Sequence, residues 1–516
     1  MVEDWHDGAS RQRIGNAARH ARRREPADHG WLLMQLGWTV PHSLAPADGA
    51  IRSKRRVAAA ILLIAMLSLE MLSLLTGVAI AAYAAWTAML LYWVAAADLY
   101  TARERIILAI CAVASAALIY NGRWDALGRS LDQAAFLASF ISMMGLLREA
   151  AARSPAVLTC GVYLTMQPPQ RRYFATHLGG HGMGVLVNFG AISLLAPLIQ
   201  RGVHASGAPP DIALIRERRQ LTALIRGFSW MVVWAPTSVT QALLATAIAG
   251  VQLHGLLLYG LLTSLLMLGV GWSEDRLHWR GLAKRVRTDG WKASLPPPFP
   301  RRAFLSLAGV SSGIIASVII FHWLFGVPTT HALMITAPLT LIVWLIVQGG
   351  TAHLRANTRG ILLDALPNGG REIIMLGASG FLGVAAAALV PAGPIAERIG
   401  GWGLSPAMFL IALPIIVVAA GQVAISPIMV VVFLAAVIGA FPVPLADPTL
   451  TALSLSCGWA LSMTASPNAS GAIMLARVTG RSSYQLTWEW NFAYNLLALA
   501  VLAILFTVFT KLPIMG

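Results

Sequence analysis

Two short polar segments interrupt apolar stretches that are long enough to cross a membrane. The first is residues 234–240, WAPTSVT, and the second is residues 464–470, TASPNAS. Each contains a proline, which lacks a backbone N–H and disturbs the hydrogen bonds of the preceding helical turn. Lipid cannot satisfy the freed backbone groups, so a broken span needs protein or a water-filled cavity around it. Paired breaks in two halves of a chain predict the binding site of a transporter.

These breaks favour the chemistry of anion binding. A helix that restarts after a break directs free N–H groups and the positive end of its dipole into the cavity. Two alternatives stay open: freed carbonyl groups could hold Na⁺, and any single hydroxyl could simply bond to its own helix. The predicted solute-binding residues are Asn188, Thr237, Ser238, Thr240, Ser426, Ser466, Asn468 and Ser470.

His177 and His181 lie four residues apart beside a glycine-dense run at 179–182. On a helix they would share one face, as a coupling site for protons or a metal ion requires. The glycines argue against a rigid helix, and no H-E-x-x-H pattern is present. We retain both histidines as candidates for ion coupling, and we predict no catalytic residue, no metal site and no cofactor other than a coupling Na⁺.

The composition predicts an all-α polytopic membrane protein. Of the 516 residues, 57% are hydrophobic and 12% are charged, whereas a soluble protein carries roughly a quarter charged residues. The formal net charge is +16, but Lys and Arg are concentrated in the first 50 residues and in particular loops. This is the pattern of cytoplasmic loops rather than of a nucleic-acid-binding domain.

The expected organisation is a basic, disordered cytoplasmic tail (1–50), an extra membrane helix (57–76) and two repeats joined by a basic cytoplasmic linker. The linker is 273–302. The first repeat, 78–272, holds a re-entrant hairpin at 154–200 and a broken helix at 226–248. The second, 303–512, holds a hairpin at 391–448 and a broken helix at 450–476. About eleven crossings are expected, and an odd number in each repeat makes the repeats inverted.

The basic flanks of the spans place the N-terminus in the cytoplasm and the C-terminus outside the inner membrane of a bacterium. Arg148, Arg226 and Arg371 stand at the ends of predicted spans, where membrane topology and snorkelling explain them. The bilayer is therefore an expected partner, and nucleic acid is not.

At the breaks and at the two hairpin tips, 188–190 (NFG) and 425–427 (ISP), the chain resembles the ion transporter superfamily. Within it the order of elements over residues 78–512 is most similar to the divalent anion:sodium symporter family. The large membrane subunit of tripartite transporters and the arsenite exporters are more distant look-alikes. Neither tip carries the Ser-Asn-Thr signature of the symporters. The resemblance implies an elevator motion, in which hairpins and broken helices move against a scaffold, and a homodimer.

The sequence thus predicts a secondary active transporter, not an enzyme, for a small organic anion such as a carboxylate. Ion coupling is expected, by Na⁺ or H⁺. The alternatives are an exporter of another small solute or oxyanion, a channel, and an intramembrane enzyme that uses the two histidines.

Overall fold

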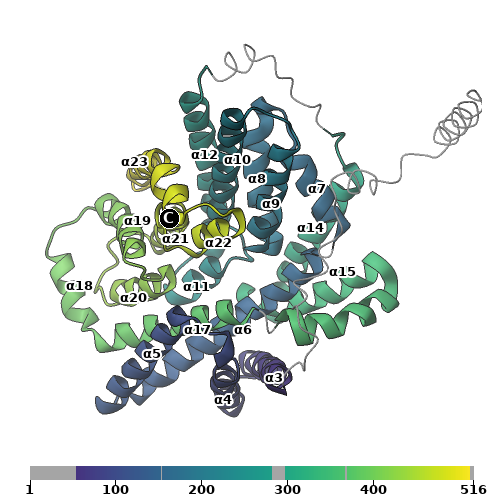
Figure 1. Cartoon of the computed structure of the whole chain (residues 1–516). Helices are drawn as coiled ribbons and strands as arrows, with labels where there is room; N and C mark the ends of the chain where they lie inside the picture. Colours follow the sequence, from purple (N-terminus) through teal and green to yellow (C-terminus); the bar gives the residue numbers. More distant parts are fainter. Residues whose placement is uncertain (1–53, 153, 282–296, 367–368, 512–516) are drawn as a thin grey trace, which may run out of the picture. The chain divides into compact units, whose positions relative to one another are not determined.

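The computed structural model describes residues 54–511 except 153, 282–296 and 367–368. The predicted tail and the central part of the linker lie outside the described residues. All contacts given below lie within the unit formed by residues 53–516. Regular secondary structure in the described part is helical throughout (Figure 1).

The helices of the first half are, in chain order, α3 (Lys54–Thr76), α4 (Ala79–Ala95), η2 (Ala97–Leu99), α5 (Ala102–Tyr120), α6 (Trp124–Ala152), α7 (Pro155–Thr165), α8 (Pro169–Val187), α9 (Gly190–His204), α10 (Pro210–Met231), α11 (Val239–Ala247) and α12 (Leu253–His278). Those of the second half are α14 (Arg301–Phe325), α15 (Thr329–Gly360), η3 (Ile361–Ala365), α17 (Gly370–Leu389), α18 (Ala392–Gly400), α19 (Pro406–Gln422), α20 (Pro427–Gly439), α21 (Pro448–Ala465), α22 (Ser470–Thr479), η4 (Gln485–Glu489) and α23 (Phe492–Phe509).

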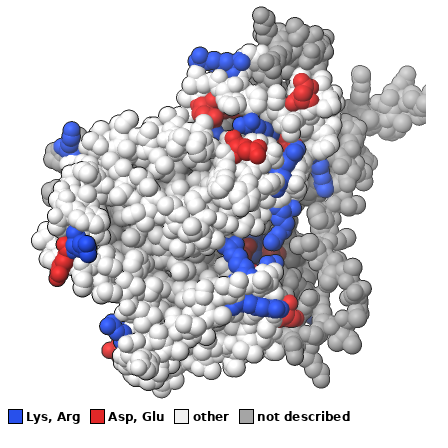
Figure 2. Space-filling model, turned by 60° about the vertical axis from the view of Figure 1, so that its left-hand side comes forward, with Lys and Arg blue, Asp and Glu red and all other residues white. Residues whose placement is uncertain are grey.

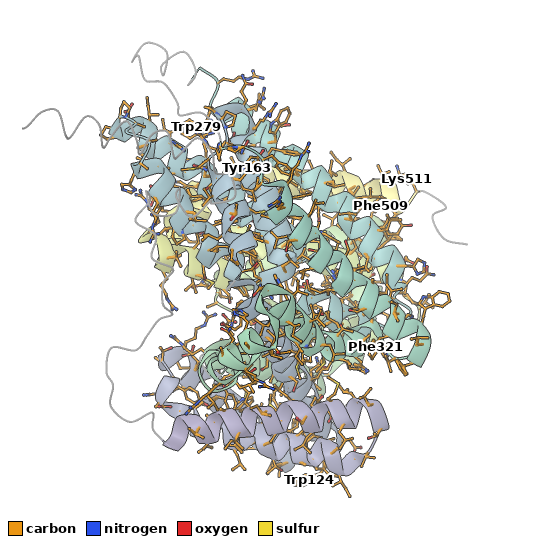
Figure 3. The ribbon with its side chains drawn as sticks, turned by 90° about the vertical axis from the view of Figure 1, so that its right-hand side faces the viewer. Trp124, Tyr163, Trp279, Phe321, Phe509 and Lys511 are labelled. Atoms are coloured by element: carbon orange, nitrogen blue, oxygen red, sulfur yellow. The ribbon has the colours of Figure 1, made fainter. Side chains whose placement is uncertain are left out.

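Seven helices of the described part are long and apolar enough to cross a membrane. They lie in α3, α6, α12, α14, α15, α17 and α23, and the remaining helices of the expected eleven crossings are shorter, broken or more polar. Trp124 begins α6 and Trp279 directly follows α12; Figure 3 shows them near the bottom and near the top of the view. Tryptophan at helix ends is typical of the two surfaces of a bilayer.

Both polar segments separate two helices. The first lies between α10 and α11, and the second lies between α21 and α22. Helix α10 begins at Pro210, much earlier than the predicted start near residue 226, because the intervening polar side chains form ion pairs and hydrogen bonds inside the protein. The predicted hairpin regions each contain three helices, α7–α9 and α18–α20, and α9 continues to His204.

The packing of the two halves is reciprocal (Figure 1). Helix α6 of the first half packs along α17 of the second half. Each of these two helices also contacts a further helix of the other half, since α17 contacts α5 and α6 contacts α15. Helix α8 packs along α10, as α19 packs along α21. The second leg of each hairpin contacts the short helix of the other half, so that α9 meets α22 and α20 meets α11. Each hairpin therefore bridges the two halves.

The glycine-dense run is helical, and the expectation that it breaks a rigid helix was wrong. Its glycines let α8 approach α10 closely, as small residues do between membrane helices. A Cβ on Gly180 would lie 2.6 Å from the carbonyl oxygen of Leu224, and one on Gly227 would lie 2.1 Å from that of His177. Gly182, on the same helix, faces open space.

We expect Gly180→Ala to destabilise the protein by about 1–3 kcal/mol, because the added methyl group must displace the backbone of α10. The melting temperature of the purified protein measures this. Gly182→Ala is the matched control and should leave the melting temperature unchanged or raise it, since alanine favours helix. Equal effects of the two substitutions would contradict the close contact between α8 and α10.

Candidate functional site

A cavity of about 480 Å³ lies where the two hairpin turns meet the two helix breaks. We call it the central cavity. Its polar lining comes from all four of these segments and includes Asn188, Ser238, Thr240, Ser426, Ser462, Ser466, Asn468 and Ser470. Seven of these eight were predicted from the sequence. Ser462 was missed because it lies one turn before the second break, where a serine in an apolar helix gives no distinct signal.

The turn between α8 and α9 places Asn188 on the cavity. Asn188 has a φ of 49° and a ψ of −129°, a positive-φ conformation that residues other than glycine rarely adopt. In the second hairpin Ala424 has a φ of 63°, and Ser426 follows as the residue before the first turn of α20. The chain thus turns sharply at both tips, so each tip presents a polar side chain to the cavity.

The first break is largely satisfied by the chain itself. The Ser238 hydroxyl accepts a hydrogen bond from the backbone N–H of Thr240 at 3.2 Å and so caps α11. Thr237 does not line the cavity, because its hydroxyl donates to the carbonyl oxygen of Val185 at 2.7 Å and holds the break against α8.

A glutamine satisfies the carbonyl groups that this break frees at the end of α10. The side-chain amide of Gln241 donates to the carbonyl oxygens of Val232, at 3.0 Å, and Val233, at 2.7 Å. The residue is 2% exposed. A polar side chain buried at this depth needs such partners, which explains a glutamine in an otherwise apolar helix.

The second break is tied to the tip of the second hairpin. The Ser466 hydroxyl donates to the carbonyl oxygen of Gly421 at 2.6 Å and accepts from the backbone N–H of Asn468 at 3.1 Å. The Asn468 amide donates to the carbonyl oxygen of Gln422 at 3.0 Å. Ser470, at the start of α22, is exposed to the cavity.

His177 and His181 lie outside the central cavity. Their rings stack with centroids 6.3 Å apart, so the two residues do share a helix face. His181 Nδ1 lies 3.1 Å from the carbonyl oxygen of Gly227, and Trp234 Nε1 donates to His181 Nε2 at 2.7 Å. This arrangement fits a neutral ring with the proton on Nδ1. His177 is 1% exposed and neither of its ring nitrogens has a partner among the described residues.

Charged side chains line one part of the cavity. The Arg371 guanidinium lies 3.4 Å from the Glu104 carboxylate. The Glu372 carboxylate forms an ion pair at 2.9 Å with Arg148, which lies outside the cavity lining. No ion pair is found for Arg103 or Arg477 within the described ranges, and both are exposed. The lining therefore has an excess of positive charge. Lys and Arg also gather along one side of the face shown in Figure 2, around a hollow.

Glu104 is held in its charged form. It precedes the apolar part of α5 and accepts hydrogen bonds from the backbone and side chain of Thr101. Burial raises the pKa of Glu104, but these hydrogen bonds, together with Arg371, outweigh burial and hold the pKa below its usual value. An ionised Glu104 offsets the charge of Arg371, so Arg103 and Arg477 carry the positive excess.

Arg226 is buried in the core, so the expectation that it snorkels at a span end was wrong. Its side chain is 2% exposed and lies 2.8 Å from Glu274. It also donates to Asn491 at 2.7 Å, and its guanidinium lies 4.0 Å from the centroid of the Tyr494 ring. Glu274 falls in the predicted linker, 273–302, but it lies within α12. This distant counter-charge is what allows an arginine in the middle of α10.

The chain is similar to a known protein in its structure rather than in its sequence. No model of a known protein family matches the chain, and no curated protein was found to resemble it. The YdaH transporter of Alcanivorax borkumensis, whose structure is described as having an unusual topology, is similar in fold. The TM-score is 0.50 at 15% identity, over 72% of this chain and 84% of that chain. The chain is an all-α polytopic membrane protein. Its fold is similar to that of a membrane transporter.

We expect Glu274→Gln to destabilise the protein by about 3–5 kcal/mol, because the substitution leaves the Arg226 charge buried without its counter-charge. Thermal unfolding in detergent measures the effect. The matched control, Glu397→Gln, removes an exposed carboxylate on α18 and should change the melting temperature little. A melting temperature for Glu274→Gln that equals that of the control would show that the ion pair does not stabilise the core.

Proposed function

We propose that the protein is a secondary active transporter of small organic anions and that the central cavity is its binding site. The convergence of both hairpin tips and both helix breaks on one positively charged cavity carries this proposal. Hydroxyl and amide donors can bind the oxygen atoms of an anion, and a helix N-terminus adds favourable dipoles. Arg103 and Arg477 can attract the anion toward the cavity.

The rest of the lining favours an anion with an apolar body. It is mainly apolar and includes Met231, Met375, Met463, Met474 and Trp459. Methionine adapts its shape to irregular apolar groups, and tryptophan offers a flat apolar surface. A strongly hydrated ion would leave this surface unfilled, whereas an amphipathic carboxylate would cover it while its charged group meets the polar segments.

The geometry of the breaks favours an anion over a cation. Carbonyl oxygens are the groups that would bind Na⁺, and at both breaks they already accept hydrogen bonds from side chains. Gln241 engages two of them at the first break. At the second break, the side-chain amide of Asn495 donates to the carbonyl oxygen of Thr464 at 3.1 Å, and that of Gln422 donates to the carbonyl oxygen of Ala465 at 3.3 Å. Donors at the second break, in contrast, remain free for a ligand.

The wider proposal takes its remaining parts from the family resemblance and the pattern of basic residues. It comprises an elevator motion, coupling to Na⁺ or H⁺, a homodimer and a bacterial inner membrane with the N-terminus in the cytoplasm. The reciprocal contacts of α9 with α22 and of α20 with α11 support a moving unit built from both halves.

We expect organic carboxylates to raise the melting temperature of the detergent-purified protein. The probes are octanoate, benzoate, succinate and citrate, with a sulfonate and arsenite for comparison, each with and without Na⁺. Octanoate and benzoate should stabilise more than citrate because of the apolar lining. A requirement for Na⁺ would identify the coupling ion. If none of these anions stabilises the protein, the anion proposal is wrong, and a steady current through reconstituted protein would identify a channel instead.

We expect Arg477→Gln to weaken the binding of the best of these carboxylates by about threefold to tenfold, because an exposed charge contributes modestly and is screened by salt. The affinity of wild type should also fall with added salt. The control is Arg398→Gln, which removes an exposed positive charge on α18 outside the cavity lining. A variant at Arg477 that binds as tightly as the control would remove this arginine from the site.

A further inference from the structure

The two helix breaks are related in sequence but not in chemistry. Aligning Pro236 with Pro467 pairs Met231 with Ser462, and it pairs Ser238 with Ala469. Met231, Ser238, Ser462 and Ala469 all line the central cavity. The first break therefore presents a methionine and a serine that is used as a helix cap, while the second presents a serine and no cap.

Ser462 has an unused hydroxyl in the cavity wall. The residue is 1% exposed, and its Oγ has no hydrogen-bond partner among the described residues. Serine in a helix usually donates to the carbonyl oxygen of the preceding turn, and Ser456 on the same helix does bond its own backbone, at 2.8 Å to Leu453. A buried hydroxyl without a partner costs free energy, so the position of Ser462 calls for a ligand.

Gly421 packs directly against this hydroxyl. A Cβ built on Gly421 would lie 2.7 Å from the Ser462 Oγ and 3.3 Å from the Cβ of Ser466. The Gly421 carbonyl oxygen accepts the Ser466 hydroxyl and contacts the Asn468 amide at 3.4 Å. The Ser462 hydroxyl thus lies beside residues of the second break itself.

The N-terminus of α22 is available at the same place. Its preceding residue, Ala469, makes no side-chain hydrogen bond to the helix, so the first N–H groups of α22 have no cap. In the first break Ser238 provides that cap for α11. A negatively charged group could take the place of the missing cap, because helix N-termini favour anions.

From this difference we propose that the carboxylate of the transported anion binds at the second break. It accepts hydrogen bonds from the Ser462 hydroxyl and from the N-terminus of α22, both of which belong to the lining of the central cavity. The apolar body then lies toward Met231 and the first break. This inference rests on the proposed function, and it fixes which of the two related breaks holds the charge.

Three substitutions test the assignment, with binding of octanoate and benzoate measured by ligand-dependent melting temperature. Ser462→Ala removes the free hydroxyl and should weaken binding roughly tenfold, as expected for a hydrogen bond to a charged group. Gly421→Ala places a methyl group against the Ser462 Oγ, so it displaces this hydroxyl and should weaken binding at least as much. The control, Ser456→Ala, changes a buried serine of α21 that bonds its own backbone, and it should bind as wild type does.

Ala469→Ser gives the sharpest outcome because stability and affinity should move in opposite directions. The new hydroxyl can cap α22 as Ser238 caps α11, so the melting temperature without ligand should rise. The cap occupies the N–H groups that the carboxylate needs, so binding should weaken. A misfolded variant could not show this combination.

The possible outcomes distinguish a failure of this site assignment from a failure of the proposed function. If wild type binds octanoate or benzoate and Ser462→Ala, Gly421→Ala and Ala469→Ser all leave the affinity unchanged, the charged group binds elsewhere and the assignment is overturned while the proposed function stands. If wild type binds neither probe, nor any other anion of the panel, the proposed function fails and this assignment fails with it.

Discussion

Breaking a helix inside a membrane frees backbone groups that lipid cannot satisfy. The rest of this structure depends on how those groups are satisfied. At the first break, side chains of the same region satisfy them: Gln241 engages the carbonyl oxygens at the end of α10, and Ser238 caps α11. At the second break, Asn495 and Gln422 engage the carbonyl oxygens of Thr464 and Ala465, and the start of α22 has no side-chain cap.

The need to satisfy the backbone groups of both breaks explains why the hairpins pack against the breaks. Each hairpin covers a break and provides either a carbonyl acceptor or an apolar surface, so the four segments enclose one cavity. The glycines of α8 permit the close approach to α10 that brings the first tip to its position. The buried Arg226–Glu274 pair joins α10 to α12, and the bond from Arg226 to Asn491 extends this network to the end of the second half. The cavity therefore sits in a framework in which the two halves support each other.

Much of the fold class could be predicted from the sequence, because it depends on local patterns. Apolar stretches of sufficient length indicate membrane helices, and proline among small polar residues indicates a break. The same reasoning selected seven of the eight polar residues named for the cavity. It failed where a role depends on a distant partner. Arg226 looks like a span-end residue until Glu274 is placed beside it, and the glycines near His181 look flexible until α10 packs against them.

The unused hydroxyl of Ser462 shows a further limit of sequence reasoning. Its proposed role rests on the absence of a hydrogen-bond partner among the described residues and on its position against Gly421, neither of which a sequence pattern reports. Repeated sequence also suggests that two breaks act alike, whereas hydrogen bonding makes them different. The proposed site therefore depends on which groups remain unsatisfied, more than on which residue types are present.

The most direct test of the account measures whether both hairpin tips face one cavity that attracts anions. Single cysteines replace Asn188 or Ser426 in a protein whose three native cysteines have been removed. Each variant is treated with an anionic and a cationic methanethiosulfonate of similar size, and the rates are divided by those of a free thiol. The account predicts that both cysteines react and that both prefer the anionic reagent. Unreactive tips, or a preference for the cationic reagent at either tip, would contradict it.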